Sequence, residues 1–278
     1  MEDSQLKVLS VINPKGGMAK TFTCQSLAVE LSLMSKGKLK ILLVDGDGSR
    51  NTTTSAIEKI DTIDKTLKNI FEDKNSDISE AIYDCTEQFP GIFVLAGDED
   101  LESPSDVIGN RKNRETILKR SLEKLKGFDL AIIDTPATRN LITQNAMAAC
   151  DYYLVPIDHD KNGVNGFLAT KDMLKNLLDE EVIKKEPICI GGFFTRVSEG
   201  HNVTKIADNA LKELIKEGVI HKDEVLKIRV PFTPHTKEAT WADTTLQFQR
   251  KHKVTKCYTK LANIVVKKMD ISLKGAHI

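Results

Sequence analysis

The sequence predicts an α/β fold in which one mostly parallel, twisted sheet is covered by helices on both faces. Short apolar runs alternate with longer amphipathic ones along the chain, a pattern that is typical of such sheets. The chain has 278 residues, enough for one large domain, and shows no internal repeat, low-complexity tract or Pro/Gly/Ser-rich linker. We therefore expect a single domain over residues 1–278.

Strands are expected where short apolar runs end next to glycine, proline or acidic residues. Such runs are typical of strands that are buried on both faces of a parallel sheet. The expected strands are Lys7–Asn13, Lys40–Asp45, Ile92–Ala96, Leu130–Asp134, Tyr152–Ile157, Ile188–Phe194 and Leu226–Val230.

Helices are expected where apolar residues recur every three or four positions. The polar stretch Glu58–Ser79 fits this pattern poorly, and we interpret it as a helical excursion or a loop within the same domain. The expected helices are Lys20–Met34, Asn113–Lys126, Leu141–Cys150, Gly166–Leu178, Val203–Glu217 and Val254–Met269.

The overall composition points to no particular partner. Forty basic and forty acidic residues cancel, so a nucleic acid or a membrane would have to bind a local patch. The five cysteines show neither a CxxC pair nor metal-ligand spacing, and we expect reduced thiols, mostly in the core. The first residues are polar, and no apolar run approaches the roughly 20 residues of a membrane span. We expect a soluble, cytoplasmic protein.

The segment Lys15–Thr21 has the composition of a phosphate-binding loop, because it follows an apolar strand and opens a helix. Lys20 would reach the β- and γ-phosphates of a nucleotide, and the Thr21 hydroxyl would ligate Mg²⁺. Lys15 is an additional lysine that ordinary phosphate loops do not require. The alternative interpretation is a lysine-rich surface turn.

The chain departs from the general pattern of a phosphate loop at two positions, because the pattern has glycine where this chain has Pro14, just before the segment, and Ala19, within it. Gly16 and Gly17 are retained. A Cβ at residue 19 is tolerable only at negative φ or if the loop absorbs strain.

Aspartates end two of the expected strands, at the sheet edge where parallel sheets bind their ligands. Asp134 closes one apolar strand and is expected to hold Mg²⁺ through water. Asp45 ends another strand, and Asp47 lies two residues further on; either carboxylate could orient the water that attacks a phosphate. Asp47 could equally be a turn residue.

A third candidate is Pro156–Asp160, where an expected strand ends and polar residues begin. If the protein forms a dimer, this segment could line the side of the site that faces the second subunit. His159 has no partner at metal-binding spacing, and we interpret it as a loop residue.

These motifs resemble the ParA/MinD group of deviant Walker-type ATPases, and within it the short, Soj-like ParA proteins of DNA partitioning. Lys15 matches the signature lysine of the group's loop, residues 43–53 match its second motif, and residues 128–136 match its Walker B segment. The chain departs from the group at Ala19 and at Gly48–Arg50, which stands in place of Pro-Gln-Gly. None of these departures removes a charged group that catalysis needs.

The resemblance implies a P-loop NTPase fold and an ATPase that uses ATP and Mg²⁺, is an ATP-bound homodimer and is slow without a partner. Lys15 of one subunit would reach the phosphates bound by the other, and Asp47 would position water with Asp45 behind it. A ParB-like centromere-binding protein would stimulate hydrolysis and so dissolve the dimer. The implied nucleotide-binding residues are Lys15, Gly16, Gly17, Met18, Ala19, Lys20, Thr21, Phe22, Pro231 and Phe232, with Thr21 and Asp134 at the metal.

A basic C-terminal segment, about residues 250–269, carries no acidic residue over Arg250–Lys268. On a helix, much of it would form one positive face that suits sequence-independent binding to DNA phosphates. The alternative is an ordinary solvated helix surface. Trp241 and Tyr258 are expected in the core. The expected DNA-binding residues are Arg250, Lys251, Lys253, Lys256 and Lys260.

Two other functions are weighed against DNA partitioning. A MinD-like positioning ATPase would need a membrane-binding helix, but the tail after Met269 is short and has little apolar face, so we expect no stable membrane association. A metabolic enzyme of the same fold would be an amide-forming synthase or an iron–sulfur reductase, and the cysteine spacing does not support a cluster. We expect a partitioning ATPase associated with the nucleoid.

Overall fold

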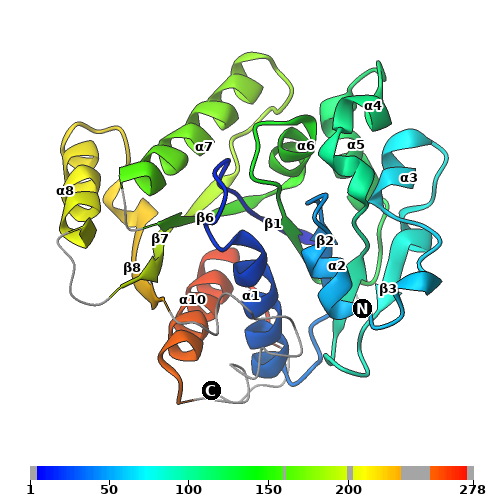
Figure 1. The fold of residues 1–278 in the computed structure, drawn as a ribbon, viewed down its shortest axis with the longest axis horizontal. Helices are drawn as coiled ribbons and strands as arrows, with labels where there is room; N and C mark the ends of the chain where they lie inside the picture. Colours follow the sequence, from blue (N-terminus) through cyan, green and yellow to red (C-terminus); the bar gives the residue numbers. More distant parts are fainter. Residues whose placement is uncertain (1–4, 159–160, 199–202, 233–250, 274–278) are drawn as a thin grey trace.

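One sheet of eight strands runs through the described part of the chain, in the order β3-β4-β2-β5-β1-β6-β7-β8 (Figure 1). The computed structural model describes residues 5–158, 161–198, 203–232 and 251–273. β3 is antiparallel to β4, and the other neighbouring strands are parallel. The strands are β1 (Lys7–Val11), β2 (Ile41–Asp45), β3 (Ile82–Asp84), β4 (Ile92–Leu95), β5 (Leu130–Asp134), β6 (Tyr152–Asp158), β7 (Ile188–Val197) and β8 (Val225–Pro231).

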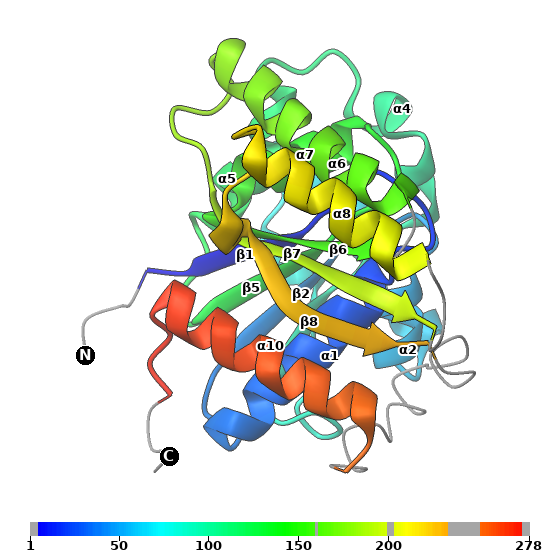
Figure 2. The same cartoon turned by 90° about the vertical axis from the view of Figure 1, so that its left-hand side faces the viewer.

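Helices cover both faces of this sheet (Figure 2). One core lies between the sheet and α1, α2 and α10, and the other lies between the sheet and α3 to α8. Strands that are enclosed in this way bury both their faces, which explains why they read as continuous apolar runs. The helices are α1 (Lys20–Ser35), α2 (Asn51–Ala56), α3 (Leu67–Glu72), α4 (Pro104–Ile108), α5 (Ile117–Leu122), α6 (Leu141–Ala149), α7 (Lys161–Asp179), α8 (Val203–Lys216) and α10 (Lys253–Met269).

The register of the central strands brings the sequence motifs together. Val11, at the end of β1, lies opposite Asp134 of β5 and Leu154 of β6. Asp45, at the end of β2, also lies opposite Asp134. The loops that follow β1, β2 and β5 therefore leave the sheet at one edge, which is the carboxyl edge where such folds place their ligands.

The predicted fold class is confirmed, and the seven expected strands are present with ends shifted by at most three residues. The short edge strand β3 and the short helices α2 and α4 were not predicted, since runs this brief show too little periodicity. The expected helix Asn113–Lys126 is α-helical only over Ile117–Leu122 and begins as a 3₁₀ turn at Arg114–Thr116. The stretch Glu58–Ser79 contains α3, so its interpretation as a helical excursion is confirmed.

Tyr258 is buried as expected, whereas Trp241 lies outside the described residues. No helix in the described ranges is both long enough and apolar enough to cross a membrane.

Candidate functional site

The phosphate loop, residues Lys15–Thr21, follows β1 and includes the first two residues of α1, and it holds two residues in the left-handed backbone region. Gly17 has φ 73°, and Ala19, the residue that caps α1, has φ 58° and ψ 37°. The Cβ of Ala19 therefore strains the loop, which is the second of the two possibilities left by the sequence. No side chain of the cap accepts a hydrogen bond at this helix end, and the first turn holds no acidic residue. The N–H groups of the first turn are thus suited to an anion.

The two lysines of the phosphate loop have different surroundings. Lys20 is 6% exposed, and its Nζ donates a hydrogen bond to the Lys15 carbonyl at 3.1 Å. Burial lowers the pKa of Lys20, and the carboxylates of Asp134 and Asp47 partly offset this change. The half-buried Lys15 makes no side-chain hydrogen bond or ion pair with any residue that the structure describes. The Lys20 amine is therefore bonded within the loop, whereas the Lys15 amine is available to a ligand.

Side chains from neighbouring strands hold the phosphate loop in place. Asn13 donates from Nδ2 to the Pro156 carbonyl at 2.9 Å and accepts the Lys15 N–H at 3.1 Å. The hydroxyl of Thr195, near the end of β7, donates to the Met18 carbonyl at 3.4 Å. α7 can approach Asn13 because a Cβ at Gly166 would lie 2.3 Å from its Oδ1.

Arg196, which sequence reasoning missed, joins the loop to the end of β8. Its guanidinium donates to the Gly17 carbonyl at 2.9 Å and lies 3.8 Å from a carboxylate oxygen of Asp158. The same group lies 5.8 Å from the ring centroid of Phe232, whose N–H donates to the Val197 carbonyl. This arrangement brings the expected residue Phe232 toward the loop. The only sequence signal was a cation near the end of a predicted strand.

Asp134 is fully buried behind the phosphate loop. Its Oδ2 accepts a hydrogen bond from the Thr52 hydroxyl at 3.1 Å, whereas its Oδ1 has no hydrogen-bond partner among the residues that the structure describes. Burial is the largest cause that raises the pKa of Asp134, to about 7, and the charge of Asp45 is the second. The nearby Thr21 hydroxyl and Lys20 lower this pKa. A buried carboxylate oxygen without a partner, next to the Thr21 hydroxyl, fits the oxygen ligands that Mg²⁺ prefers.

Asp45 and Asp47, the two carboxylates of the second motif, are used differently. Asp45 is fully buried and accepts hydrogen bonds from the Thr53 N–H and hydroxyl, both at 2.7 Å, and from the Asp47 N–H at 3.3 Å. Burial raises its pKa to about 6, although the bonds from Thr53 lower it. Asp47 is half-buried, and its Oδ1 accepts the Ser49 N–H at 3.0 Å. Asp45 therefore braces the start of α2, and Asp47 is the more accessible carboxylate.

The basic C-terminal segment forms a stripe on α10. Lys253, Lys256, Lys260 and Lys267 are exposed at intervals of three, four and seven residues, which places them on one face, and we call them the basic stripe. The opposite face is buried against the sheet and α1. Lys251 is exposed just before the helix, while Arg250 lies outside the described residues.

Two other predicted positions complete the description. Lys268 donates to the carbonyls of Ile190 and Asp223, so its amine is bonded to the protein itself, and we do not count it in the basic stripe. Of the third candidate motif, His159 and Asp160 lie outside the described residues.

Comparison with known proteins places these motifs in a family. Residues 6–185 match the AAA domain family AAA_31. The chain is 28% identical over 222 residues to the chromosome partitioning protein ParA of Myxococcus xanthus, covering 78% of this chain and 76% of that protein. It is 28% identical over 242 residues to the sporulation initiation inhibitor protein Soj of Bacillus subtilis, covering 84% and 87%.

Solved structures share the fold at lower identity. Cobyrinic acid a,c-diamide synthase from Mycobacterium smegmatis, with bound ADP and magnesium, is 23% identical with a TM-score of 0.76, covering 95% of this chain and 96% of that one. A variant of Cyanothece McdA in complex with ATP is 21% identical with a TM-score of 0.77, covering 97% and 98%. The cell division ATPase MinD of Pyrococcus furiosus is 23% identical with a TM-score of 0.69, covering 94% and 99%. The chain belongs to the AAA domain family AAA_31 and is a member of the ParA/MinD group of ATPases.

Proposed function

We propose that this chain is an ATP-dependent DNA-partitioning ATPase whose ATP-bound state is a homodimer. The observation that carries the proposal is the difference between the two lysines of the phosphate loop. Lys20 is buried and bonded to the loop, whereas the Lys15 amine has no partner among the described residues. Lys15 of one subunit would contact the phosphates bound by the other, as an arginine finger does in other nucleotide hydrolases.

ATP would bind with its phosphates along residues 15–22 and its base near Pro231 and Phe232. Thr21 would ligate Mg²⁺ directly and Asp134 through water, and the metal would neutralise charge on the β- and γ-phosphates. Asp47 would orient the attacking water, with Asp45 behind it as a fixed brace. Hydrolysis would be slow until a ParB-like centromere-binding partner completes the site.

The basic stripe would bind DNA without regard to sequence. Its lysines are exposed on one face of α10 and could each contact a backbone phosphate. Lys251 and Arg250 would extend this surface. If each protomer neutralises about four phosphates, the slope of log K against log salt is roughly −3.6. Such binding would place the dimer on the nucleoid in the cytoplasm.

The alternative is a MinD-like positioning ATPase at a membrane surface. An amphipathic anchor must offer an apolar face to the lipid. The apolar residues of α10 are instead packed in the core, among them Tyr258, Leu261 and Val265. This packing favours DNA over lipid as the partner of the stripe.

The test measures dimerisation and binding with a non-hydrolysable ATP analogue and Mg²⁺. Light scattering should show a dimer only with the analogue, and the dimer should bind plain duplex DNA but not anionic vesicles. Lys256→Gln/Lys260→Gln should weaken DNA binding and leave dimerisation intact. A matched control, Lys74→Gln/Lys124→Gln, removes the same charge from other exposed positions. Binding to vesicles alone, or a protein that stays monomeric, would overturn the proposal.

A further inference from the structure

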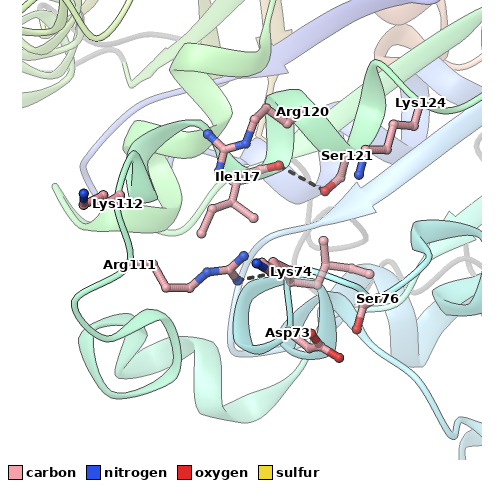
Figure 3. A pocket seen from close by; sticks show the side chains of 10 residues that line it. Asp73, Lys74, Ser76, Arg111, Lys112, Ile117, Arg120, Ser121 and Lys124 are labelled. Carbon is pink, nitrogen blue, oxygen red and sulfur yellow. Dashed lines mark hydrogen bonds between the residues drawn. The ribbon is translucent and has the colours of Figure 1, made fainter.

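A groove lined by positive side chains lies on the opposite face of the sheet from the basic stripe. It runs between the C-terminal end of α3 and α5 and has a volume of about 370 Å³ (Figure 3). In Figure 3, Arg120 and Ser121 lie on α5 and Lys124 lies just beyond its end. Asp73, Lys74 and Ser76 lie on the other side, and Arg111 extends between them. Its cations are Lys74, Arg111, Lys112, Arg120 and Lys124, and we call it the basic groove.

The charges of the basic groove are not balanced from within. Asp73 is its only acidic lining residue, and one oxygen of that carboxylate already accepts the Asn75 N–H at 2.9 Å. None of the five cations forms an ion pair with another described residue. Asp77 is near enough to Lys124 for that charge to contribute to its lowered pKa, after the hydrogen bonds from Ser79. A concave surface of one sign concentrates anions.

Both arginines of the groove are fixed by neutral partners. Arg111 donates from one nitrogen to the carbonyls of Phe71 and Ile70, at the end of α3. Arg120 donates to the Asn113 carbonyl at 3.2 Å and to the Thr116 hydroxyl at 2.5 Å. Neutral acceptors orient a guanidinium without cancelling its charge, so each retains N–H groups for a charged acceptor. The groove is therefore partly organised before any ligand arrives.

We propose that the basic groove binds a small anion that carries two or more phosphate groups. Ile70 and Ile117 are the apolar lining residues of the groove, each 3% exposed, so a ligand would gain little from apolar contact and would be held by charge. The volume lies at the lower end of the range for small-ligand sites, about 300 to 1,000 Å³. Clustered phosphates match several fixed and mobile cations around one cavity.

A DNA duplex fits this location less well. α3 and α5 belong to the core on one face of the sheet, and α10 belongs to the core on the other (Figure 2). A duplex that lies along the basic stripe cannot also enter the groove of the same protomer. A ligand of the groove would therefore be a molecule other than that duplex, and its binding would not depend on whether the stripe binds DNA.

The experiment uses the full chain saturated with ADP and excess Mg²⁺, so that the phosphate loop is filled. Inorganic tripolyphosphate is titrated by calorimetry, and a fluorescent ADP analogue reports displacement from the loop. We expect one saturable site per chain that weakens with salt. Lys74→Gln/Lys124→Gln should weaken it about tenfold or more. The side chains of both lysines are exposed and make no hydrogen bond with any described residue, so this variant should fold normally. Lys256→Gln/Lys260→Gln, the matched control, should bind as the parent does.

Each other outcome counts against the proposal. Absence of saturable binding, displacement of the ADP analogue in step with the heat, or an equal loss in both double variants would overturn it. Two further titrations use a short DNA duplex and polyglutamate. If either binds in a manner lost only in Lys74→Gln/Lys124→Gln, while tripolyphosphate does not, the groove is a macromolecular surface and the assignment to small phosphates is wrong. The dimerisation and DNA tests are read separately, because they involve α10 and the phosphate loop.

Discussion

The N-terminal ends of α1 and α2 have nearly the same backbone and opposite uses. Each helix follows a buried strand of the sheet, and each is capped by a residue other than glycine in the left-handed region, Ala19 at φ 58° and Arg50 at φ 54°. At α2 the carboxylate of Asp45 accepts the Thr53 N–H of the first turn. At α1 no side chain of the described ranges takes that place. One helix end is filled by the protein itself, and the other is left for a ligand.

The residue that ends the preceding strand produces this difference. β2 ends in Asp45, which folds back onto α2, whereas β1 ends in Val11 and continues to Asn13. Asn13 turns away from α1 and bonds to the Pro156 carbonyl instead. A carboxylate in its place would compete with phosphate for the same N–H groups. Similar loop geometry therefore gives either a structural brace or an anion site, depending on one side chain.

The largest expected effect comes from Lys15, which acts at the open helix end. Lys15→Ala should lower the ATPase rate by roughly 10³, by analogy with trans-acting cations of other nucleotide hydrolases. Nucleotide affinity of the monomer should hardly change, because Lys20 supplies the cation of the loop itself. Steady-state turnover and a fluorescent-nucleotide titration separate the two effects. Unchanged turnover would refute the trans role.

The next prediction concerns two buried carboxylates, Asp45 at the filled end and Asp134 behind the phosphate loop. Burial raises the pKa of Asp45 to about 6 and that of Asp134 to about 7, above the 3.8 of an ordinary aspartate. The folded state then binds protons that the unfolded chain has released, so this contribution to stability falls as pH rises from about 4 to about 7. Each unit of pKa displacement corresponds to about 1.4 kcal/mol.

Urea unfolding of the nucleotide-free, metal-free protein across this range measures the effect. Asp134→Asn should become steadily more stable relative to the parent as pH rises from about 4 to about 7, because the amide has no charge to bury. The difference should level off at higher pH. A difference between the two proteins that does not vary with pH would contradict the assigned pKa direction.

Thr53→Val tests the brace at α2 directly. The Thr53 hydroxyl donates to Asp45 and accepts the Gly97 N–H at 2.8 Å, so valine leaves two buried polar groups short of a partner. We expect a loss of about 2 to 3 kcal/mol in the free energy of unfolding, with nucleotide affinity nearly intact. Denaturant unfolding and nucleotide titration give the two values. Thr54→Val, at the exposed neighbouring position, is the control, and an equal loss there would show that the effect is not specific to the brace.

Much of this contrast could be predicted from the sequence. Apolar runs located β1, β2 and β5, and parallel pairing then placed the phosphate loop, Asp45 and Asp134 at one edge. Spacing alone did not separate the roles of Asp45 and Asp47, which only the resemblance distinguished, because the difference depends on which carboxylate accepts the Thr53 N–H. A short helix such as α2 gives little periodic signal in advance.

Arg196 was beyond sequence reasoning for a different reason. It meets Gly17 and Phe232 through strand pairing and loop closure, and a contact across 179 residues leaves no local pattern. The positive φ of Ala19 was likewise open, because alanine gives no sign of a left-handed backbone. The sequence thus predicts at which edge of the sheet the site lies, whereas packing determines which contacts each of its side chains makes.

Arg196→Gln should have a smaller effect than any of these changes. It removes a charge-assisted bond that holds the Gly17 carbonyl and the contact with Phe232, while leaving the phosphate-binding lysines in place. We expect nucleotide to bind about five- to tenfold more weakly, with turnover at saturation nearly unchanged. Lys227→Gln, which removes a charge from an exposed position of β8, is the control. Parallel losses in both variants would mean that net charge, rather than the tether, sets the affinity.

The smallest expected effect belongs to the two strained caps themselves. Ala19→Gly and Arg50→Gly each remove a Cβ from the left-handed region, and the gain is limited because glycine adds freedom to the unfolded chain. We expect each to raise the free energy of unfolding by at most about 1 kcal/mol, and Ala19→Gly to leave ATPase activity equal or higher. Arg50→Gly also loses an exposed ion pair with Glu99, which contributes little. Ala19→Gly could instead abolish nucleotide binding while Arg50→Gly behaves as expected. That result would mean that the N-terminal end of α1 requires alanine at residue 19 for its binding geometry and does not merely accommodate it.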